Sequence, residues 1–336
     1  MSSTASVSGP ARRPEPGADP AATLRSTTRV ARPAIAAGVA RAKLPPAVEL
    51  LAKRPDASQL GRRLDAFLEA SHPTFSVDGE SVRVPLHFTS LYGDGGRRMT
   101  LALAEIKTLL GPQRFAQLAT DVTSALSTRG QPAQIQRTVQ ALIDAGALAR
   151  YPGVEPQAAV RKLMFELRIG LDCMGYTLAA AQYARGVGDK SAPASSLGVT
   201  DRFRFNFAQA LARVSPSSTQ PGDVLHLPVE DGMREHNVVV RANQVVRVAP
   251  GETVTAAKRE VPASFVAAAR ELRVFTVDSS WGGGARGDFG GAERRTWVFN
   301  PETQRWGSWT ATGRFEQGPA PGGHSMLVAL RPAGER

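Results

Sequence analysis

The chain has 336 residues, of which 42% are hydrophobic and 21% are charged, a composition typical of a globular protein with at least one packed core. Its single cysteine excludes an intramolecular disulfide and any cluster of thiolates that would bind zinc or an iron–sulfur centre. The net charge of +11 favours an anionic partner, such as nucleic acid, anionic lipid or an acidic cell-wall polymer.

Residues 1–54 carry more than half of this positive charge. They contain nine Lys or Arg, three Asp or Glu, seven prolines and no aromatic residue, which gives a net charge of +6. A segment of this kind cannot bury enough apolar surface to offset the entropy that it would lose on ordering. We therefore predict a disordered basic tail, and because the rest of the chain carries only +5, we expect no nucleic-acid partner.

The sequence contains no run of about 18 apolar residues, so we expect no membrane span. Its first residues also lack the apolar segment of a Sec signal peptide. We expect the protein to stay in the cytoplasm until a specialised secretion system exports it, or to be secreted by another route that needs no such peptide.

Residues 55–152 predict a small helical N-terminal domain of unknown role. Residues 57–71 place Leu60, Leu64, Phe67 and Leu68 on one face, at the spacing of an amphipathic helix. A short strand is predicted at 81–88, and glycine and proline residues separate three further helices at 100–110, 112–126 and 132–148.

Residues 153–336 predict a second domain in which helices precede strands. A helix at 156–169 ends at Gly170, and a second apolar helix begins around Cys173. Candidate strands follow at 222–229, 235–242, 244–250, 271–280, 295–301 and 324–332. Helices followed by a series of antiparallel-looking strands indicate an α+β fold.

Cys173 lies where a thiol is readily held as thiolate. Asp172 is suited to cap the new helix, and the backbone N–H groups and the dipole at a helix N-terminus favour the anion. The same N–H groups would form part of an oxyanion hole in an acyl-transfer reaction. The alternative is a buried structural cysteine, which is the commoner state of a lone cysteine.

The strands downstream supply candidates for a base and an orienting carboxylate. His236 begins an apolar strand, and Asp278 lies near the end of another, the arrangement that a Cys–His–Asp relay requires. His226 is a rival base that points to the opposite face of its strand from Leu225 and Leu227. His324, which opens the last predicted strand, is a third candidate.

In their order along the chain, these motifs resemble the NlpC-type and CHAP-type cysteine peptidases. The matching residues are Asp172, Cys173, Gly175 and Tyr176, then Pro221, Gly222 and Asp223, and then His236 ahead of Val238, Val239 and Val240. The later VDSSW sequence is similar to the CHAP-type pattern, with Ser280 where an asparagine is usual. Met174 stands where a serine is common, and Asn237 where an apolar residue usually follows the histidine.

The resemblance implies a papain-like catalytic domain over residues 153–336, with a cysteine helix packed on an antiparallel sheet. It implies a cysteine amidase or endopeptidase that cleaves peptidoglycan stem peptides, with Cys173, His236 and Asp278 as the catalytic residues. Peptidoglycan or a peptide is the expected substrate, an immunity or inhibitor protein is a further expected partner, and no metal or organic cofactor is expected. Two alternatives stay open: the same fold acting on a host protein as a protease, deamidase or acyltransferase, and a binding module without catalysis.

The tryptophans indicate where a substrate would lie. All four fall between residues 281 and 309, among glycine-rich stretches. Aromatic faces beside flexible loops are typical of grooves that bind sugars or peptides. We therefore expect Trp281 to line the groove with Tyr176 and Ser280; the alternative is that the tryptophans form the core of the C-terminal sheet.

Overall fold

The computed structural model describes residues 56–89, 95–128, 130–184, 211–227, 236–267, 269–282, 290–310, 312–320 and 327–332. The predicted tail and His324 lie outside these ranges, so the expectations for them are not tested.

The first half of the described chain is mainly helical. Its elements are α2 (Ala57–Ala70), β1 (Thr74–Val77), β2 (Glu80–Arg83), α3 (Gly95–Leu126), α4 (Pro132–Asp144), the 3-10 helix η2 (Ala147–Arg150) and α5 (Pro156–Glu166). The helices predicted at 100–110 and 112–126 are two arms of α3, which is kinked at Gly111, where φ is 70°, just before Pro112. The strand predicted at 81–88 ends at Arg83, and it pairs with β1 in a hairpin that was not predicted.

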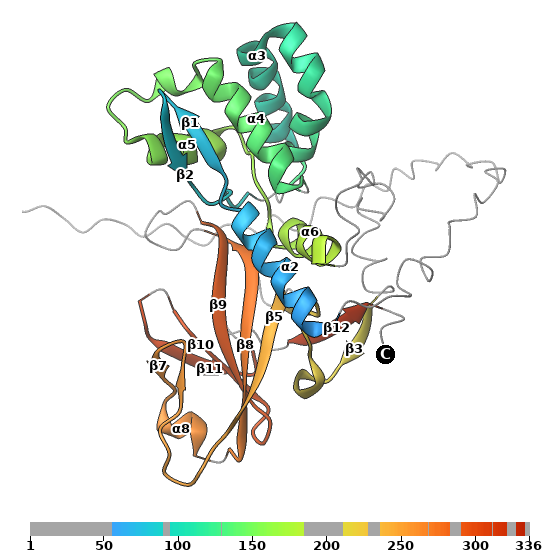
Figure 1. Cartoon of the computed structure of the whole chain (residues 1–336), viewed down its shortest axis with the longest axis vertical. Coiled ribbons are helices and arrows are strands. Elements are labelled where there is room, and N and C mark those ends of the chain that lie inside the picture. Colours follow the sequence, from blue (N-terminus) through green and yellow to red (C-terminus); the bar gives the residue numbers. More distant parts are fainter. Residues whose placement is uncertain are drawn as a thin grey trace, which may run out of the picture. The chain divides into compact units, whose positions relative to one another are not determined.

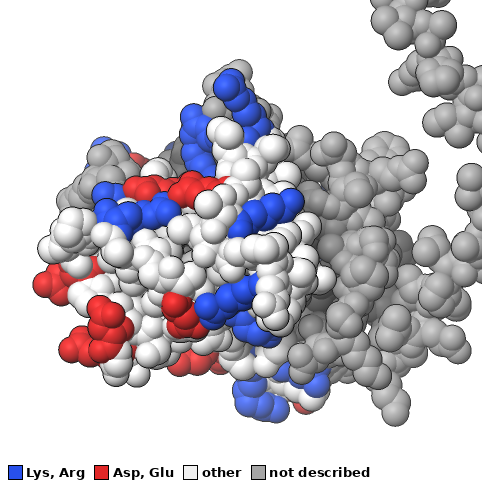
Figure 2. Space-filling model, turned by 90° about the horizontal axis from the view of Figure 1, so that it is seen from above, with Lys and Arg blue, Asp and Glu red and all other residues white. Residues whose placement is uncertain are grey.

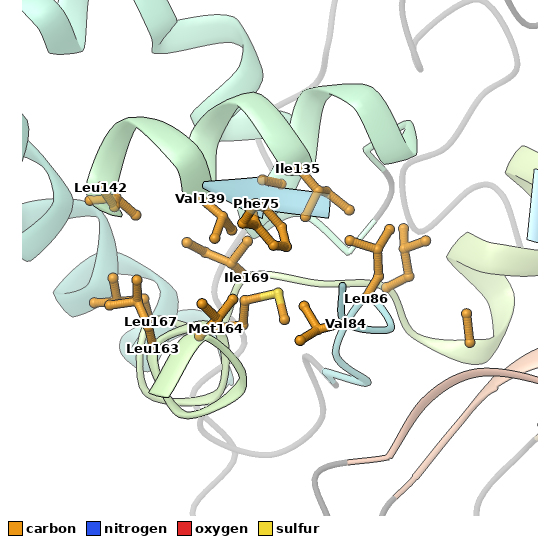
Figure 3. Packing of buried hydrophobic residues seen from close by; sticks show 14 of the residues in the cluster. Phe75, Val84, Leu86, Ile135, Val139, Leu142, Leu163, Met164, Leu167 and Ile169 are labelled. Atoms are coloured by element: carbon orange, nitrogen blue, oxygen red, sulfur yellow. The ribbon is translucent and has the colours of Figure 1, made fainter. Parts of the chain in front are cut away.

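The apolar residues of this half form one continuous core. Phe75 of the hairpin, Ile135 and Val139 of α4, and Leu163 and Met164 of α5 are all buried in it (Figure 3). Amphipathic helices are stable in this way because each buries its apolar face against a neighbouring element.

The second half is built on an antiparallel sheet, so the described fold is α+β. After α6 (Cys173–Ala184), the strands lie in the order β11-β10-β9-β8-β5-β4-β12-β3. Their bounds are β3 (Leu211–Val214), β4 (Val224–Leu227), β5 (His236–Arg247), β8 (Glu271–Trp281), β9 (Gly291–Asn300), β10 (Arg305–Trp309), β11 (Phe315–Gly318) and β12 (Val328–Pro332). The strands predicted at 235–242 and 244–250 are one strand, β5, with an irregularity between Val240 and Ala242. The small elements η4 (Pro216–Ser218), β6 (Thr255–Ala256), β7 (Arg259–Glu260) and α8 (Ala263–Val266) complete this half.

The two faces of the central strands differ in what they bury. On one face, Leu225, Leu227, Val238 and Val240 pack with the aromatic side chains of β8, β9 and β10. On the other face, Val239 belongs to the core that α2 and α6 share with the helical half. Figure 1 shows α2 and α6 beside β5, and we call this the helix-facing side of the sheet.

The boundary predicted at residue 152 does not separate two cores. The described residues from 56 onward belong to one compact unit. Helix α2, which was assigned to a separate N-terminal domain, contacts α6 and β5, and its Phe67 ring meets the Tyr176 ring edge to face at 5.2 Å. The amphipathic face of α2 is therefore part of what holds the cysteine helix on the sheet.

Charges of both signs are interspersed on the surface of the helical half. Ion pairs join Arg114 to Asp144 at 2.8 Å and Arg137 to Asp121 at 2.7 Å, and Figure 2 shows basic and acidic side chains mixed on the face that it presents. Within the part of the chain that the structure describes, no helix is both long and apolar enough to cross a bilayer.

Candidate active site

Cys173 is the first residue of α6, and its side chain is largely covered, with 8% of the residue exposed. The segment that leads into it is held by backbone bonds: Leu171 N–H donates to the His87 carbonyl at 3.0 Å, and the Leu171 carbonyl accepts from Thr89 N–H at 3.2 Å. The Leu171 carbonyl also accepts from the Ser280 hydroxyl of β8 at 2.8 Å. The start of the cysteine helix is thus fixed to the end of β8.

Asp172 caps α6 with one carboxylate oxygen and binds the α3–α4 connection with the other. Oδ1 accepts from the backbone N–H of Gly175 at 2.5 Å, the usual bond of an N-cap residue, and Oδ2 accepts from the Thr128 hydroxyl at 2.9 Å. The backbone of Thr128 approaches Gly175 so closely that a Cβ on Gly175 would lie 1.8 Å from the Thr128 carbonyl oxygen. The glycine of the DCMG sequence is therefore required by packing.

The cysteine face of α6 lies over the beginning of β5. Thr177 donates its hydroxyl to the Asn237 carbonyl at 3.1 Å, and the Ser279 hydroxyl donates to the same carbonyl at 2.7 Å. Cys173 is four residues before Thr177, so the two side chains project from the same face of the helix. This face is the one that meets the helix-facing side of the sheet.

His226 and Asn237 form a hydrogen-bonded pair on that same side. His226 of β4 lies directly opposite Asn237 of β5, and its Nδ1 is 2.8 Å from the Asn237 Oδ1. Val239, two residues beyond Asn237, belongs to the core shared with α6. Residues two apart on a strand point to the same face, so Asn237 also points to the helix-facing side of the sheet. Because an amide oxygen only accepts, Nδ1 is the donor and Nε2 is the basic nitrogen of the neutral ring.

Asn237 is 1% exposed, and none of the residues that the structure describes accepts a hydrogen bond from its Nδ2. Buried amides are usually hydrogen-bonded, so a buried Nδ2 without a described acceptor needs an explanation. In the sequence, Asn237 is marked only by its departure from the family pattern, which has an apolar residue after the histidine.

His236, which the resemblance favours as the base, lies on the other face of the sheet from α6. It pairs with Leu227, and its ring packs against Trp281 at a tilt of 40°, with 4.3 Å between the ring centroids. Leu227 and Trp281 both belong to the apolar core beneath the sheet. Adjacent residues of a strand point to opposite faces, so His236 and Asn237 cannot both project toward α6.

Asp278 is not placed to orient His236. It is fully buried on the helix-facing side, and both of its oxygens are bound by Arg294, at 2.7 and 2.9 Å. Arg294 also contacts Asp65 of α2 at 2.8 Å, and Asp65 in turn pairs with Arg241 at 2.6 Å. These four side chains form a network that ties α2 to β5, β8 and β9.

The pKa directions follow from this network. Burial raises the pKa of Asp278, and the bonds from Arg294 oppose that effect. The hydrogen bond from Arg241 lowers the pKa of Asp65, and the Asp278 carboxylate raises the pKa of Arg294. Asp278 therefore acts in the structure as the buried partner of an arginine.

The three residues expected to line a groove are buried, which corrects that expectation. Tyr176 is fully buried against Phe67, and burial raises the pKa of its phenol. Ser280 is fully buried, and Trp281 is 9% exposed, with the Arg295 guanidinium stacked 3.9 Å from its ring. The tryptophans at 281, 297 and 306 belong to the core of the sheet, as the alternative to a groove predicts.

The PGD sequence at 221–223 has a structural explanation. Gly222 adopts a φ of 86°, and Asp223 is fully buried. Its carboxylate accepts from the Arg331 guanidinium of β12 at 2.8 Å and from the Gln220 N–H at 2.8 Å. The motif forms the turn before β4 and fixes it to the neighbouring strand.

The described residues contain no group of three or more His, Cys, Asp or Glu side chains that could hold a metal ion. No family model, curated protein or solved structure matches the chain.

Proposed function

We propose that the chain is a cysteine hydrolase that cleaves an amide bond, with Cys173 as the nucleophile, His226 as the base and Asn237 as the residue that orients the imidazole. The observation that carries the proposal is the bond between His226 Nδ1 and Asn237 Oδ1, at 2.8 Å, on the sheet face that carries the cysteine helix. Nucleophilic catalysis by a thiol uses a helix N-terminus and an oriented imidazole as base; Cys173 begins the helix on the sheet face to which His226 points.

In the proposed reaction, Nε2 of His226 takes the thiol proton and the Cys173 thiolate attacks the carbonyl carbon of the amide. The resulting oxyanion lies near the positive end of the α6 dipole. The C–N bond breaks, and the amine leaves with the proton from His226, which yields a thioester. Water, deprotonated by His226, then hydrolyses the thioester and restores the thiol.

The proposed substrate is a peptidoglycan stem peptide, which rests on the resemblance of the DCMG, PGD and EHNVVV sequences to wall peptidases. On this view the protein is an exported bacterial effector, and an immunity or inhibitor protein is its partner. A host protein, as the target of protease, deamidase or acyltransferase action, is the alternative substrate. Neither substrate requires a metal or an organic cofactor.

Purified muropeptides incubated with the protein test both the chemistry and the substrate. We expect mass spectrometry to detect new peptides that differ by hydrolysis of one amide bond, and none with the Cys173→Ala variant. An unchanged muropeptide pool together with rapid alkylation of Cys173 near neutral pH would exclude the wall substrate and favour a protein substrate. An unchanged pool together with a thiol that resists alkylation in the folded protein would identify a binding module in which Cys173 is structural.

A further inference from the structure

The connection between α3 and α4 reaches the cap of the cysteine helix through one side chain. Thr128 is fully buried, and its hydroxyl donates to Asp172 Oδ2 at 2.9 Å. Its own carbonyl oxygen lies against the Cα of Gly175, where no Cβ would fit. The two contacts fall on either side of Cys173 in the sequence.

The backbone of Thr128 is strained. Its φ is 62°, a left-handed conformation that is rare for residues other than Gly, Asn and Asp and unfavourable for a β-branched side chain. A residue held in such a conformation needs surroundings that hold it there, and such residues cluster at functional sites. Glycine would relieve the strain, but it would also remove the hydroxyl that reaches Asp172.

The carboxylate of Asp172 directly precedes the thiol, so its charge affects the reactivity of Cys173. An anion beside a thiol disfavours the thiolate. Two donors, the Gly175 N–H and the Thr128 hydroxyl, hold the carboxylate in the cap. In that position it stabilises the first turn of α6, whose N–H groups favour the thiolate.

We propose that Thr128 is a positioning residue for the nucleophile, through which the helical segment between α3 and α4 sets the reactivity of Cys173. This inference rests on the proposed function, and it assigns to part of the helical half a role in the chemistry. Without the Thr128 hydroxyl, the Asp172 carboxylate is held by one donor fewer, and the Cys173 thiolate loses stabilisation.

The test is the rate of alkylation of Cys173 by iodoacetamide as a function of pH in the folded protein, which contains no other thiol. Thr128→Val keeps the shape and the strain and removes only the hydroxyl. We expect its alkylation profile to move to higher pH by about half a unit to one unit. At a pH below the thiol pKa, this lowers the alkylation rate about two- to fourfold. The decrease is smaller than the loss of thiolate, because a more basic thiolate is also more nucleophilic. Thr128→Ser, which keeps the hydroxyl, should restore the wild-type profile.

Thr138→Val is the matched control. Thr138 is fully buried in α4, and its hydroxyl has no hydrogen-bond partner among the residues that the structure describes. The same substitution there should change the thermal midpoint without moving the alkylation profile. In an Asp172→Ala background, Thr128→Val should have no further effect on the profile, because the group on which it acts is gone.

Two outcomes overturn the inference and can be told apart. A wild-type thiol that reacts readily near neutral pH, with an unchanged profile in Thr128→Val, refutes the positioning role alone. A wild-type thiol that titrates like an ordinary cysteine, together with intact substrate in the hydrolysis assay, refutes the proposed function and this inference together.

Discussion

Two histidines lie at the same end of the β4–β5 pair and on opposite faces of it. His226 lies opposite Asn237 in the paired strands and points to the side of the sheet that carries α6. His236 lies opposite Leu227 and packs against Trp281 in the apolar core. The polar pair is thus on the side that carries Cys173, and the histidine that begins β5 is on the other.

The comparison shows that motif order along the chain does not determine the face of a strand. In the sequence EHNVVV, His236 and Asn237 are adjacent polar residues. A change of one residue in the register of the strand would decide which of the two side chains points toward the helix. The apolar residues Val238 and Val240 pack beneath the sheet, so alternation assigns His236 to the core and Asn237 to the helix.

The largest expected effect comes from replacing each histidine in turn. We expect His226→Ala to lower kcat for amide hydrolysis about 10²- to 10⁴-fold, the range typical of a general base, while His236→Ala lowers it a few-fold at most through lost packing on Trp281. Circular dichroism and thermal midpoints should show that both variants fold. The reverse ranking of the two variants would restore His236 as the base and contradict our assignment.

A second comparison, between the buried Asp278 and the partly exposed carboxylate of Glu316, separates structural from catalytic roles. We expect Asp278→Ala to lower the free energy of unfolding by about 2 to 4 kcal/mol, somewhat less than for a fully buried pair because Arg294 keeps its contact with Asp65. Glu316→Ala, which removes the partner of the highly exposed Arg314, should cost less than about 1 kcal/mol. Urea denaturation measures both values.

The activity of the Asp278 variant then decides its role. Hydrolysis per folded molecule should stay within a few-fold of wild type, because Asp278 binds Arg294 and lies on the opposite face from His236. A loss of several orders of magnitude in a variant that remains folded would show that Asp278 belongs to the catalytic relay.

Local signals were enough to predict the longer helices and the start of α6, though not the short α8. Gly170, Asp172 and the apolar run after Cys173 predicted where the helix begins, since capping depends on residues close in sequence. The period-two pattern around Leu225 also placed His226 on the face opposite the apolar core.

Contacts between distant residues could not be predicted in this way. The bond from Thr128 to Asp172 joins residues 44 positions apart, and the pairing of Asp65 with Arg241 joins residues 176 positions apart. Neither pair has a local pattern that marks it. Asp278 was assigned to a relay because a buried ion pair and a catalytic carboxylate look alike in a sequence.

The smallest expected effect concerns acid stability and again compares the helix-facing network with an exposed site. Because Arg241 lowers the pKa of Asp65, this carboxylate contributes stability above its unfolded pKa of 3.8, and the contribution is lost as the pH falls through and below that value. Asp278 acts in the opposite direction: its raised pKa gives a contribution that is present below pH 3.8 and lost as the pH rises.

Asp65→Asn should therefore flatten the fall in unfolding free energy between about pH 5 and pH 3, while Asp78→Asn, in the exposed turn between β1 and β2, should leave the slope unchanged. The change should stay below about 1 kcal/mol, because 40% of the Asp65 side chain and 26% of the Arg241 side chain are exposed and solvent screens the pair. Urea titrations at a series of pH values measure the slope. An Asp65→Asn slope as steep as that of wild type would mean that α2 is held to the sheet by its apolar face, with the ion pairs contributing nothing measurable.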